Sequence, residues 1–131
     1  PSRSMKVYID ACFSGDSPKG MLIRAASGLT VKISAPKSEK QKMIVITAAE
    51  GDQFASWDED AKLGLFTKHL LEALNGVADK KDFGGNNDGK VTLGEVKYYL
   101  DEEMTYQARR RFSRDQRATV SGDPSTILSA Y

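Results

Sequence analysis

The feature that most constrains the fold is a continuous apolar run at residues 43–48, Met-Ile-Val-Ile-Thr-Ala. The run has the length of a strand, and its lack of polar alternation is typical of a strand covered on both faces in a mainly parallel sheet. A second β-rich run, Met-Lys-Val-Tyr-Ile, covers residues 5–9, and the Ser, Gly and Pro residues that follow favour a turn. We therefore expect two strands early in the chain.

Two helices and a closing strand are expected after these runs. Apolar residues recur at helical spacing over residues 63–74, and Gly76 supplies a stop. Residues 92–95, Thr-Leu-Gly-Glu, form a capping box that opens a second helix through about Tyr106. The segment Ser-Thr-Ile-Leu-Ser at residues 125–129, which follows a turn at Gly-Asp-Pro, predicts the closing strand. The order strand, strand, helix, helix, strand indicates an α/β protein.

The bulk properties exclude several classes of protein. The chain has 131 residues, which fits one compact domain. No apolar run approaches the roughly 18–20 residues that a membrane span needs, and no signal peptide opens the sequence, so we expect no membrane contact. The net charge of +1 is too small to favour nucleic acid as a partner. The single cysteine excludes an intrachain disulfide and favours a reducing compartment, so we expect a cytoplasmic protein.

Cys12 is the residue whose position most suggests chemistry. It follows the run at residues 5–9, and functional sites in open α/β sheets gather at the carboxyl ends of strands. Ser14 and Gly15 are small, so the chain can turn sharply there and a substrate can approach. Placement alone leaves two interpretations open, a nucleophile or a small buried apolar residue.

Residues 8–15, Tyr-Ile-Asp-Ala-Cys-Phe-Ser-Gly, resemble the strand that leads to the catalytic cysteine of the caspase-like cysteine peptidases, especially the metacaspases and their bacterial relatives. The order of features downstream is similar to that family as well. These features are Thr-Ala-Ala at 47–49, Asp52-Gln53, Gly-Leu-Phe-Thr at 64–67 and Asn-Asp-Gly at 87–89. The resemblance runs from about residue 6 to 122, nearly the whole chain.

The resemblance implies a caspase-like three-layer α/β/α sandwich with a mainly parallel sheet. Residues 1–131 would be the C-terminal part of this single domain and would supply its later strands and helices. The implied activity is that of a cysteine endopeptidase that works by a Cys-His dyad through a thioester. The family's histidine precedes the cysteine by roughly 50 residues, but only 11 residues precede Cys12. We therefore expect that histidine in an N-terminal part or a second chain of the same protein, and we interpret His69 as a helix residue.

The resemblance also assigns a substrate site. Cys12 would be the nucleophile, and its backbone N–H would hold the oxyanion. Asp10 would line the primary specificity pocket, where a carboxylate selects Arg or Lys in a protein or peptide substrate. Asp52, which is slightly preferred, or Asp58 would add a second carboxylate, and Trp57 would form a wall. For Asp58, together with Glu59 and Asp60, the alternative is the first turn of a helix, where acids complement the helix dipole.

A long basic loop is expected at residues 16–42, where members of the family carry a linker between subunits. With an acidic pocket, Lys19, Arg24 and Lys32 are candidate self-cleavage sites. The alternative is a solvated loop whose lysines keep the protein soluble.

Residues 84–95 nearly match a calcium-binding helix-loop-helix loop, but Gly84 stands where the first aspartate ligand belongs. A calcium-binding module is therefore an alternative to the peptidase, and calcium is a candidate activator. The proposed chemistry itself needs no cofactor, and we assign no metal ligand.

Two further alternatives concern partners. A non-catalytic caspase-like scaffold or adaptor would keep the fold without the chemistry, although an intact Cys12 and Asp10 argue against it. Nucleic-acid binding would use a basic segment at residues 107–117, but no recognised motif accompanies it. The arginines of this segment are Arg109, Arg110, Arg111, Arg114 and Arg117.

Overall fold

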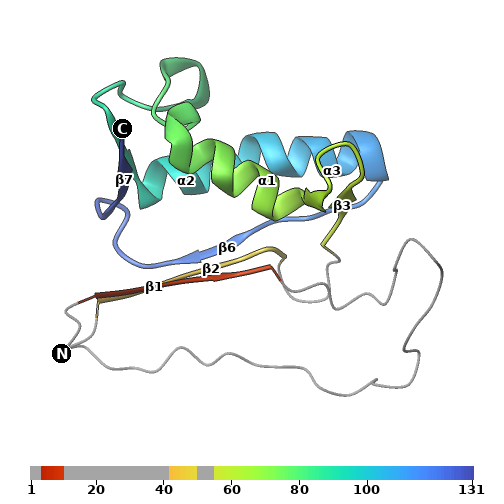
Figure 1. The fold of residues 1–131 in the computed structure, drawn as a ribbon, viewed down its shortest axis with the longest axis horizontal. Helices are drawn as coiled ribbons and strands as arrows, with labels where there is room; N and C mark the ends of the chain where they lie inside the picture. The colour runs from red at the N-terminus through yellow and green to blue at the C-terminus, as the bar shows by residue number, and fades with distance from the viewer. Residues whose placement is uncertain (1–3, 11–41, 50–54) are drawn as a thin grey trace.

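The central element is a three-stranded mixed sheet with strand order β1-β2-β6. The computed structural model describes residues 4–10, 42–49 and 55–131. β1 (Ser4–Ile9) and β2 (Lys42–Thr47) are parallel, with Met5 opposite Met43, and β6 (Thr119–Ser121) pairs antiparallel with β2. Figure 1 shows this sheet below the helices.

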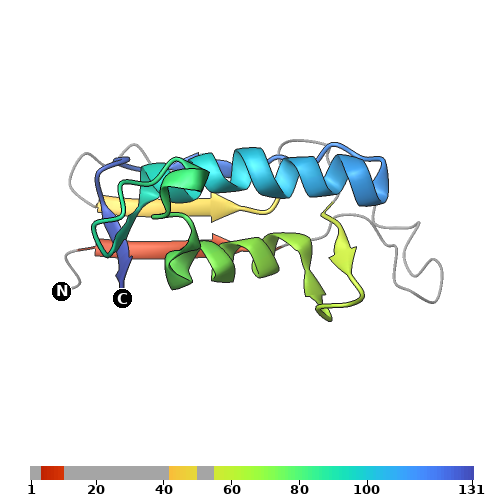
Figure 2. The ribbon, with the colours of Figure 1, turned by 90° about the horizontal axis from the view of Figure 1, so that it is seen from above.

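Two helical segments lie side by side along the sheet (Figure 2). The first is α1 (Leu65–Glu72), which continues into the wider turn η1 (Ala73–Val77). Gly76 lies in η1 with a φ of 100°, a left-handed conformation that glycine adopts without a steric penalty, so it ends the regular helix as expected. The second segment consists of α2 (Leu93–Tyr99), η3 (Leu100–Met104) and α3 (Thr105–Phe112).

Two small antiparallel sheets lie at opposite ends of the helical layer. The hairpin of β3 (Trp57–Asp58) and β4 (Leu63–Gly64) lies beyond the carboxyl ends of β1 and β2 (Figure 2). The pair of β5 (Lys90–Thr92) and β7 (Ile127–Ala130) lies at the other end, near the short helix η2. The η2 helix covers Lys81–Phe83.

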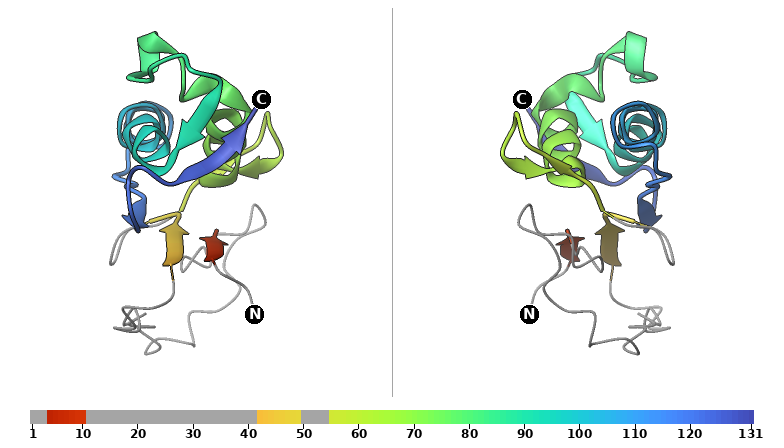
Figure 3. Two further views of the ribbon diagram at one scale, coloured as in Figure 1. Left: turned by 90° about the vertical axis from the view of Figure 1, so that its left-hand side faces the viewer. Right: turned by 90° about the vertical axis from the view of Figure 1, so that its right-hand side faces the viewer.

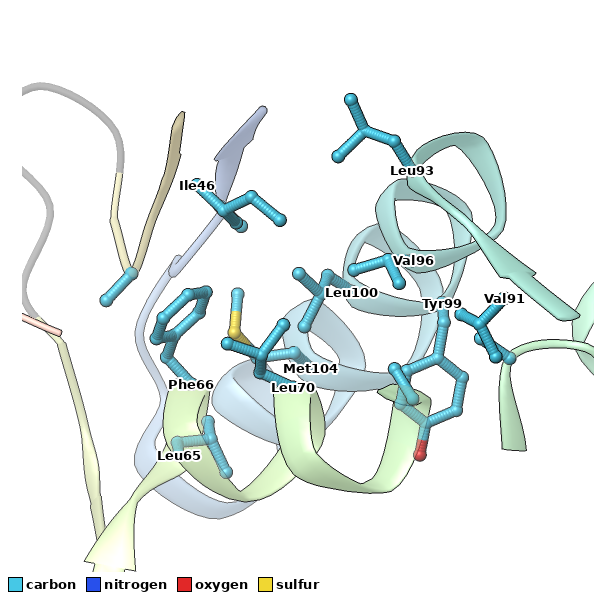
Figure 4. Close-up of a cluster of buried hydrophobic side chains, with 14 of the residues drawn as sticks. Ile46, Leu65, Phe66, Leu70, Val91, Leu93, Val96, Tyr99, Leu100 and Met104 are labelled. Carbon is cyan, nitrogen blue, oxygen red and sulfur yellow. The ribbon is translucent and has the colours of Figure 1, made fainter. Parts of the chain in front are cut away.

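The hydrophobic core fills the space between β2 and the helices (Figure 4). Ile44 and Ile46 are buried, whereas Met43 and Val45 are half-buried, which is the alternation of a strand with one fully covered face. The largest buried apolar side chains from outside the sheet are Leu65, Phe66, Val91, Leu93, Val96, Leu100 and Met104. Among the described residues the helices cover one face of the sheet (Figure 3).

The local sequence signals are confirmed by the structure. The two early strands, the first helix and the closing strand are all present, and Thr92 and Glu95 form a reciprocal capping box. The second helix runs past Tyr106 to Phe112, because Met104 and Ala108 continue its buried stripe.

The described part of the chain shows mixed α/β content, and the three-layer, mainly parallel sandwich stays a prediction. The closing strand β7 pairs with β5 rather than joining the central sheet. The third strand of that sheet is β6, which is too short to give a periodic signal in the sequence. Within residues 4–10, 42–49 and 55–131, no helix combines the length and the apolar character needed to cross a membrane.

Candidate functional site

Asp10 lies directly after β1, at the carboxyl end of the parallel pair. The backbone N–H of Ala48 donates to the carbonyl of Ile9 at 2.9 Å, so the two strands remain joined up to this point. The Asp10 side chain is exposed, and its carboxylate accepts a hydrogen bond from the hydroxyl of Thr67 in the first turn of α1.

Gly64 makes this arrangement sterically feasible. A Cβ atom at position 64 would overlap the Asp10 carboxylate, so any larger residue would push the acid away. Gly64 and Thr67 both belong to the Gly-Leu-Phe-Thr segment at residues 64–67. The structure therefore brings Asp10 into contact with a segment that is far from it in the sequence.

Trp57 lies on the same face of the β3–β4 hairpin as the Asp10 carboxylate. Trp57 pairs with Gly64 across the hairpin, and paired residues of antiparallel strands project to the same side. The missing Cβ of Gly64 would point at Asp10, so Trp57 projects toward that side as well. Trp57 is 48% exposed, which leaves its ring open to a ligand. We call Asp10, Trp57, Gly64 and Thr67 the Asp10 cluster.

Asp58, the neighbour of Trp57, faces the opposite way and is fully buried. Its Oδ2 atom lies 2.8 Å from Lys68 Nζ and 2.9 Å from Arg111 Nη1. The hydrogen bond from the Lys68 ammonium lowers the pKa of the Asp58 carboxyl to about 2 against the opposing effect of burial, and Arg111 also lowers it. Asp58 is thus neutralised by cations of the chain itself.

The helix-terminus interpretation of the acids at residues 58–60 is wrong. Asp58 Oδ1 accepts hydrogen bonds from the backbone N–H groups of Asp60 and Ala61, both at 3.1 Å, so it stabilises the hairpin turn. The helix α1 begins later, at Leu65. Sequence reasoning missed Lys68 and Arg111 as partners of Asp58, because they lie 10 and 53 residues away from it.

Several predicted site residues lie outside the described residues. They are Cys12, Lys19, Arg24, Lys32 and Asp52. Their assignments stay predictions, as does the linker at residues 16–42.

His69 lies in α1 and is buried, with 3% of its surface exposed. Its Nδ1 atom donates to the carbonyl of Leu65 at 2.8 Å, and its ring lies 6.1 Å from the ring of Tyr99. This environment agrees with the interpretation of His69 as a helix residue.

The loop at residues 84–95 is organised by Asp79, a buried residue that sequence reasoning missed. Asp79 accepts hydrogen bonds from the backbone N–H groups of Asp88 and Gly89 and from the hydroxyl of Tyr131. Burial alone would raise the pKa of Asp79, but these hydrogen bonds hold it below its ordinary value.

Two carboxylates of this loop, those of Asp88 and Glu95, accept hydrogen bonds from the backbone. Glu95 accepts from the backbone N–H groups of Asn86 and Thr92, and Asp88 accepts from that of Lys90. In the described parts of the chain, no group of three or more His, Cys, Asp or Glu side chains is arranged to hold a metal ion.

The basic segment is partly committed to internal contacts. Arg111 binds Asp58 and Asp60, Arg109 pairs with Asp115 at 2.6 Å, and the guanidinium of Arg110 lies over the ring of Tyr106.

No family model, no curated protein and no solved structure matches this chain.

Proposed function

We propose that this chain carries the nucleophile and the specificity pocket of a caspase-like cysteine endopeptidase that cleaves after Arg or Lys. The observation that carries the proposal is the Asp10 cluster. It holds an exposed carboxylate, two residues before Cys12, on the same side of the β3–β4 hairpin as an exposed tryptophan.

The chemistry of the cluster suits a guanidinium or ammonium group. An exposed carboxylate can accept charge-assisted hydrogen bonds from an arginine, and an indole ring attracts a cation that lies over its face. The side-chain partner of Asp10 among the described residues is the Thr67 hydroxyl, which is uncharged. Within this part of the chain, the negative charge of Asp10 is therefore left for a ligand. Asp58 cannot serve in the same way because Lys68 and Arg111 already bind it.

The proposed reaction follows the thiol route. The Cys12 thiolate attacks the carbonyl carbon of the scissile bond, and the backbone N–H of Cys12 holds the resulting oxyanion. The intermediate collapses to a thioester while a histidine donates a proton to the leaving amine. The same histidine then takes a proton from a water molecule, and the resulting hydroxide attacks the thioester, so the acid product leaves and the Cys12 thiolate and the protonated histidine are restored. We place that histidine in an N-terminal part or partner chain, because His69 is buried and bonded to Leu65.

The face of the central sheet that the described helices leave uncovered supports a need for that additional part. Paired residues of parallel strands share a face, so Met5, Val7, Met43 and Val45 project away from the described helices. An apolar face of this kind requires a cover, and a second helical layer would supply one. The three-layer sandwich is accordingly part of the proposal.

The direct test uses an arginyl peptide that carries a cysteine-reactive electrophile, followed by intact-mass analysis under denaturing conditions. We expect one adduct on this chain, absent in Cys12→Ala and formed more slowly in Asp10→Asn. A matched aspartyl peptide with the same electrophile should react slowly with the unmodified chain. Equal labelling by both peptides would contradict the basic specificity. In a preparation that contains the His-bearing part, labelling by iodoacetamide without labelling by either peptide would favour the non-catalytic scaffold.

A further inference from the structure

Gln116 is a fully buried polar residue that the proposed chemistry does not use. Its side-chain amide joins two separate segments. The Nε2 atom donates to the carbonyl of Ala48 at 3.0 Å, and the Oε1 atom accepts from the backbone N–H of Ser56 at 2.7 Å. We call this pair of hydrogen bonds the Gln116 bridge. The two contacts lie 68 and 60 residues away from Gln116 in sequence.

Each end of the Gln116 bridge leads to one side of the Asp10 cluster. On one side, Ala48 donates its N–H to the carbonyl of Ile9, the residue before Asp10. On the other side, Ser56 precedes Trp57 in the chain.

A second set of contacts also links Ser56 to the Asp10 cluster. The carbonyl of Ser56 accepts a hydrogen bond from the N–H of Leu65 at 2.7 Å. Leu65 follows Gly64, which pairs with Trp57 and packs against Asp10. Together, the Gln116 bridge and these contacts hold the hairpin that carries Trp57 against the end of β1, which Asp10 directly follows.

From this geometry we propose that Gln116 is a positioning residue that sets the separation between the Asp10 carboxylate and the Trp57 ring. This inference rests on the proposed function, because it assigns Gln116 a role at the same cation-binding site. The primary amide suits the role because it offers a donor and an acceptor at once. A buried apolar side chain of similar size would fill the space but would leave the Ala48 carbonyl and the Ser56 N–H without partners.

The test measures binding of agmatine, a small guanidinium compound, to the chain. Trp57 is its only tryptophan, so tryptophan fluorescence reports on the Asp10 cluster directly. Butylurea, which is similar in shape and uncharged, serves as the control ligand. Gln116→Met removes the bridge with little change in volume, and we expect agmatine to bind about tenfold more weakly.

Two control variants separate positioning from general destabilisation. Thr105→Val removes a hydroxyl that donates to the backbone carbonyl of Gln116 at 3.1 Å and leaves the side-chain bridge intact. Ser56→Ala removes a buried hydroxyl that has no hydrogen-bond partner in the described residues, and it keeps the backbone N–H. Both variants should bind agmatine as the unmodified chain does, even where Thr105→Val lowers the urea midpoint.

The outcomes distinguish the two proposals. If the unmodified chain binds agmatine no better than butylurea, the cation site itself fails. If it binds agmatine selectively and Gln116→Met binds it equally well, the positioning role of Gln116 is overturned while the proposed function stands.

A measurement on the unmodified chain covers the case in which Gln116→Met does not fold. Hydrogen exchange followed by NMR should show slow exchange of the Ser56 amide and of the Gln116 side-chain amide. Both should slow further when agmatine binds. Unchanged exchange on binding would also overturn the inference.

Discussion

The two faces of the β3–β4 hairpin place acidic residues in different environments. On one face, Asp58 is buried and contacts both Lys68 and Arg111. On the other face, Trp57 and Gly64 lie toward Asp10, whose side chain is exposed and accepts a hydrogen bond from the uncharged Thr67 hydroxyl.

The difference shows how a fold can separate a buried structural acid from an exposed acid, which we propose binds a ligand. Buried charge requires compensation within the protein, and Lys68 and Arg111 supply it for Asp58. Exposed charge requires none, so Asp10 can keep its negative charge for a ligand. Whether a carboxylate can bind a cation depends on the groups that already contact it. The position of the residue in the sequence does not reveal these contacts.

The largest effect is expected at the structural acid. Asp58→Ala should lower the free energy of unfolding by about 3 kcal/mol, because it leaves Lys68 and Arg111 without their shared carboxylate. Urea denaturation followed by circular dichroism measures this change. Asp60→Ala is the matched control, since Asp60 pairs with the same arginine while its side chain is 86% exposed, and it should cost at most about 0.5 kcal/mol. Equal losses in the two variants would contradict the assignment.

A pH dependence should accompany this effect. The folded-state pKa of Asp58 is about 2, below its ordinary value of 3.8. The stability that Asp58 contributes is therefore fully present above its ordinary pKa and is lost as the pH falls toward 2. The urea midpoint of the unmodified chain should decline over this range more steeply than that of Asp58→Asn. Parallel declines would show that other carboxyl groups dominate the acid response.

The binding acid should show the reverse pattern. Asp10→Asn should weaken agmatine binding by about 2 kcal/mol, or roughly 30-fold, because the ligand loses its counter-charge. The urea midpoint should change little, since the Asp10 side chain is exposed. Fluorescence titration and urea denaturation of the same variant test both halves of this prediction. A loss of stability without a loss of binding would place Asp10 with the structural acids.

The elements that could be predicted from sequence depend on local signals. The apolar run at residues 43–48, the capping box at residues 92–95 and the stop at Gly76 all involve neighbours within a few residues. The strand, the capping box and the helix stop are each confirmed, whereas coverage of both faces of the strand stays a prediction. The short strand β6 could not be predicted in the same way, because three residues carry too little periodicity.

The roles of individual site residues depend on distant partners. Arg111 lies 53 residues from Asp58, and no pattern near either residue indicates that they meet. Thr67 lies 57 residues from Asp10, and the Gln116 bridge joins segments that are farther apart still. No pattern near any of these residues indicates that they meet.

A smaller effect is expected from added volume at Gly64. Gly64→Ala places a Cβ where the Asp10 carboxylate lies, so the acid must move and agmatine binding should weaken by about 1.5 kcal/mol. The backbone φ of −58° at Gly64 suits alanine, so conformational strain should not contribute. Fluorescence titration with agmatine measures the change. Gly94→Ala is a useful comparison because it adds the same methyl group next to Pro124, in a different part of the fold. Equal weakening by both variants would mean that the effect is not local.

The smallest effect is expected at Thr67, whose hydroxyl orients the Asp10 carboxylate. Thr67→Val keeps the shape of the side chain and removes the donor, so agmatine binding should weaken by about 1 kcal/mol, or roughly fivefold. Thr67→Ser keeps the hydroxyl and should retain the affinity of the unmodified chain. Tighter binding by Thr67→Val would mean that the hydroxyl competes with the ligand for the carboxylate. In that case Thr67 would compensate Asp10 as Lys68 and Arg111 compensate Asp58. The two faces of the hairpin would then differ only in how strongly the protein itself satisfies each carboxylate.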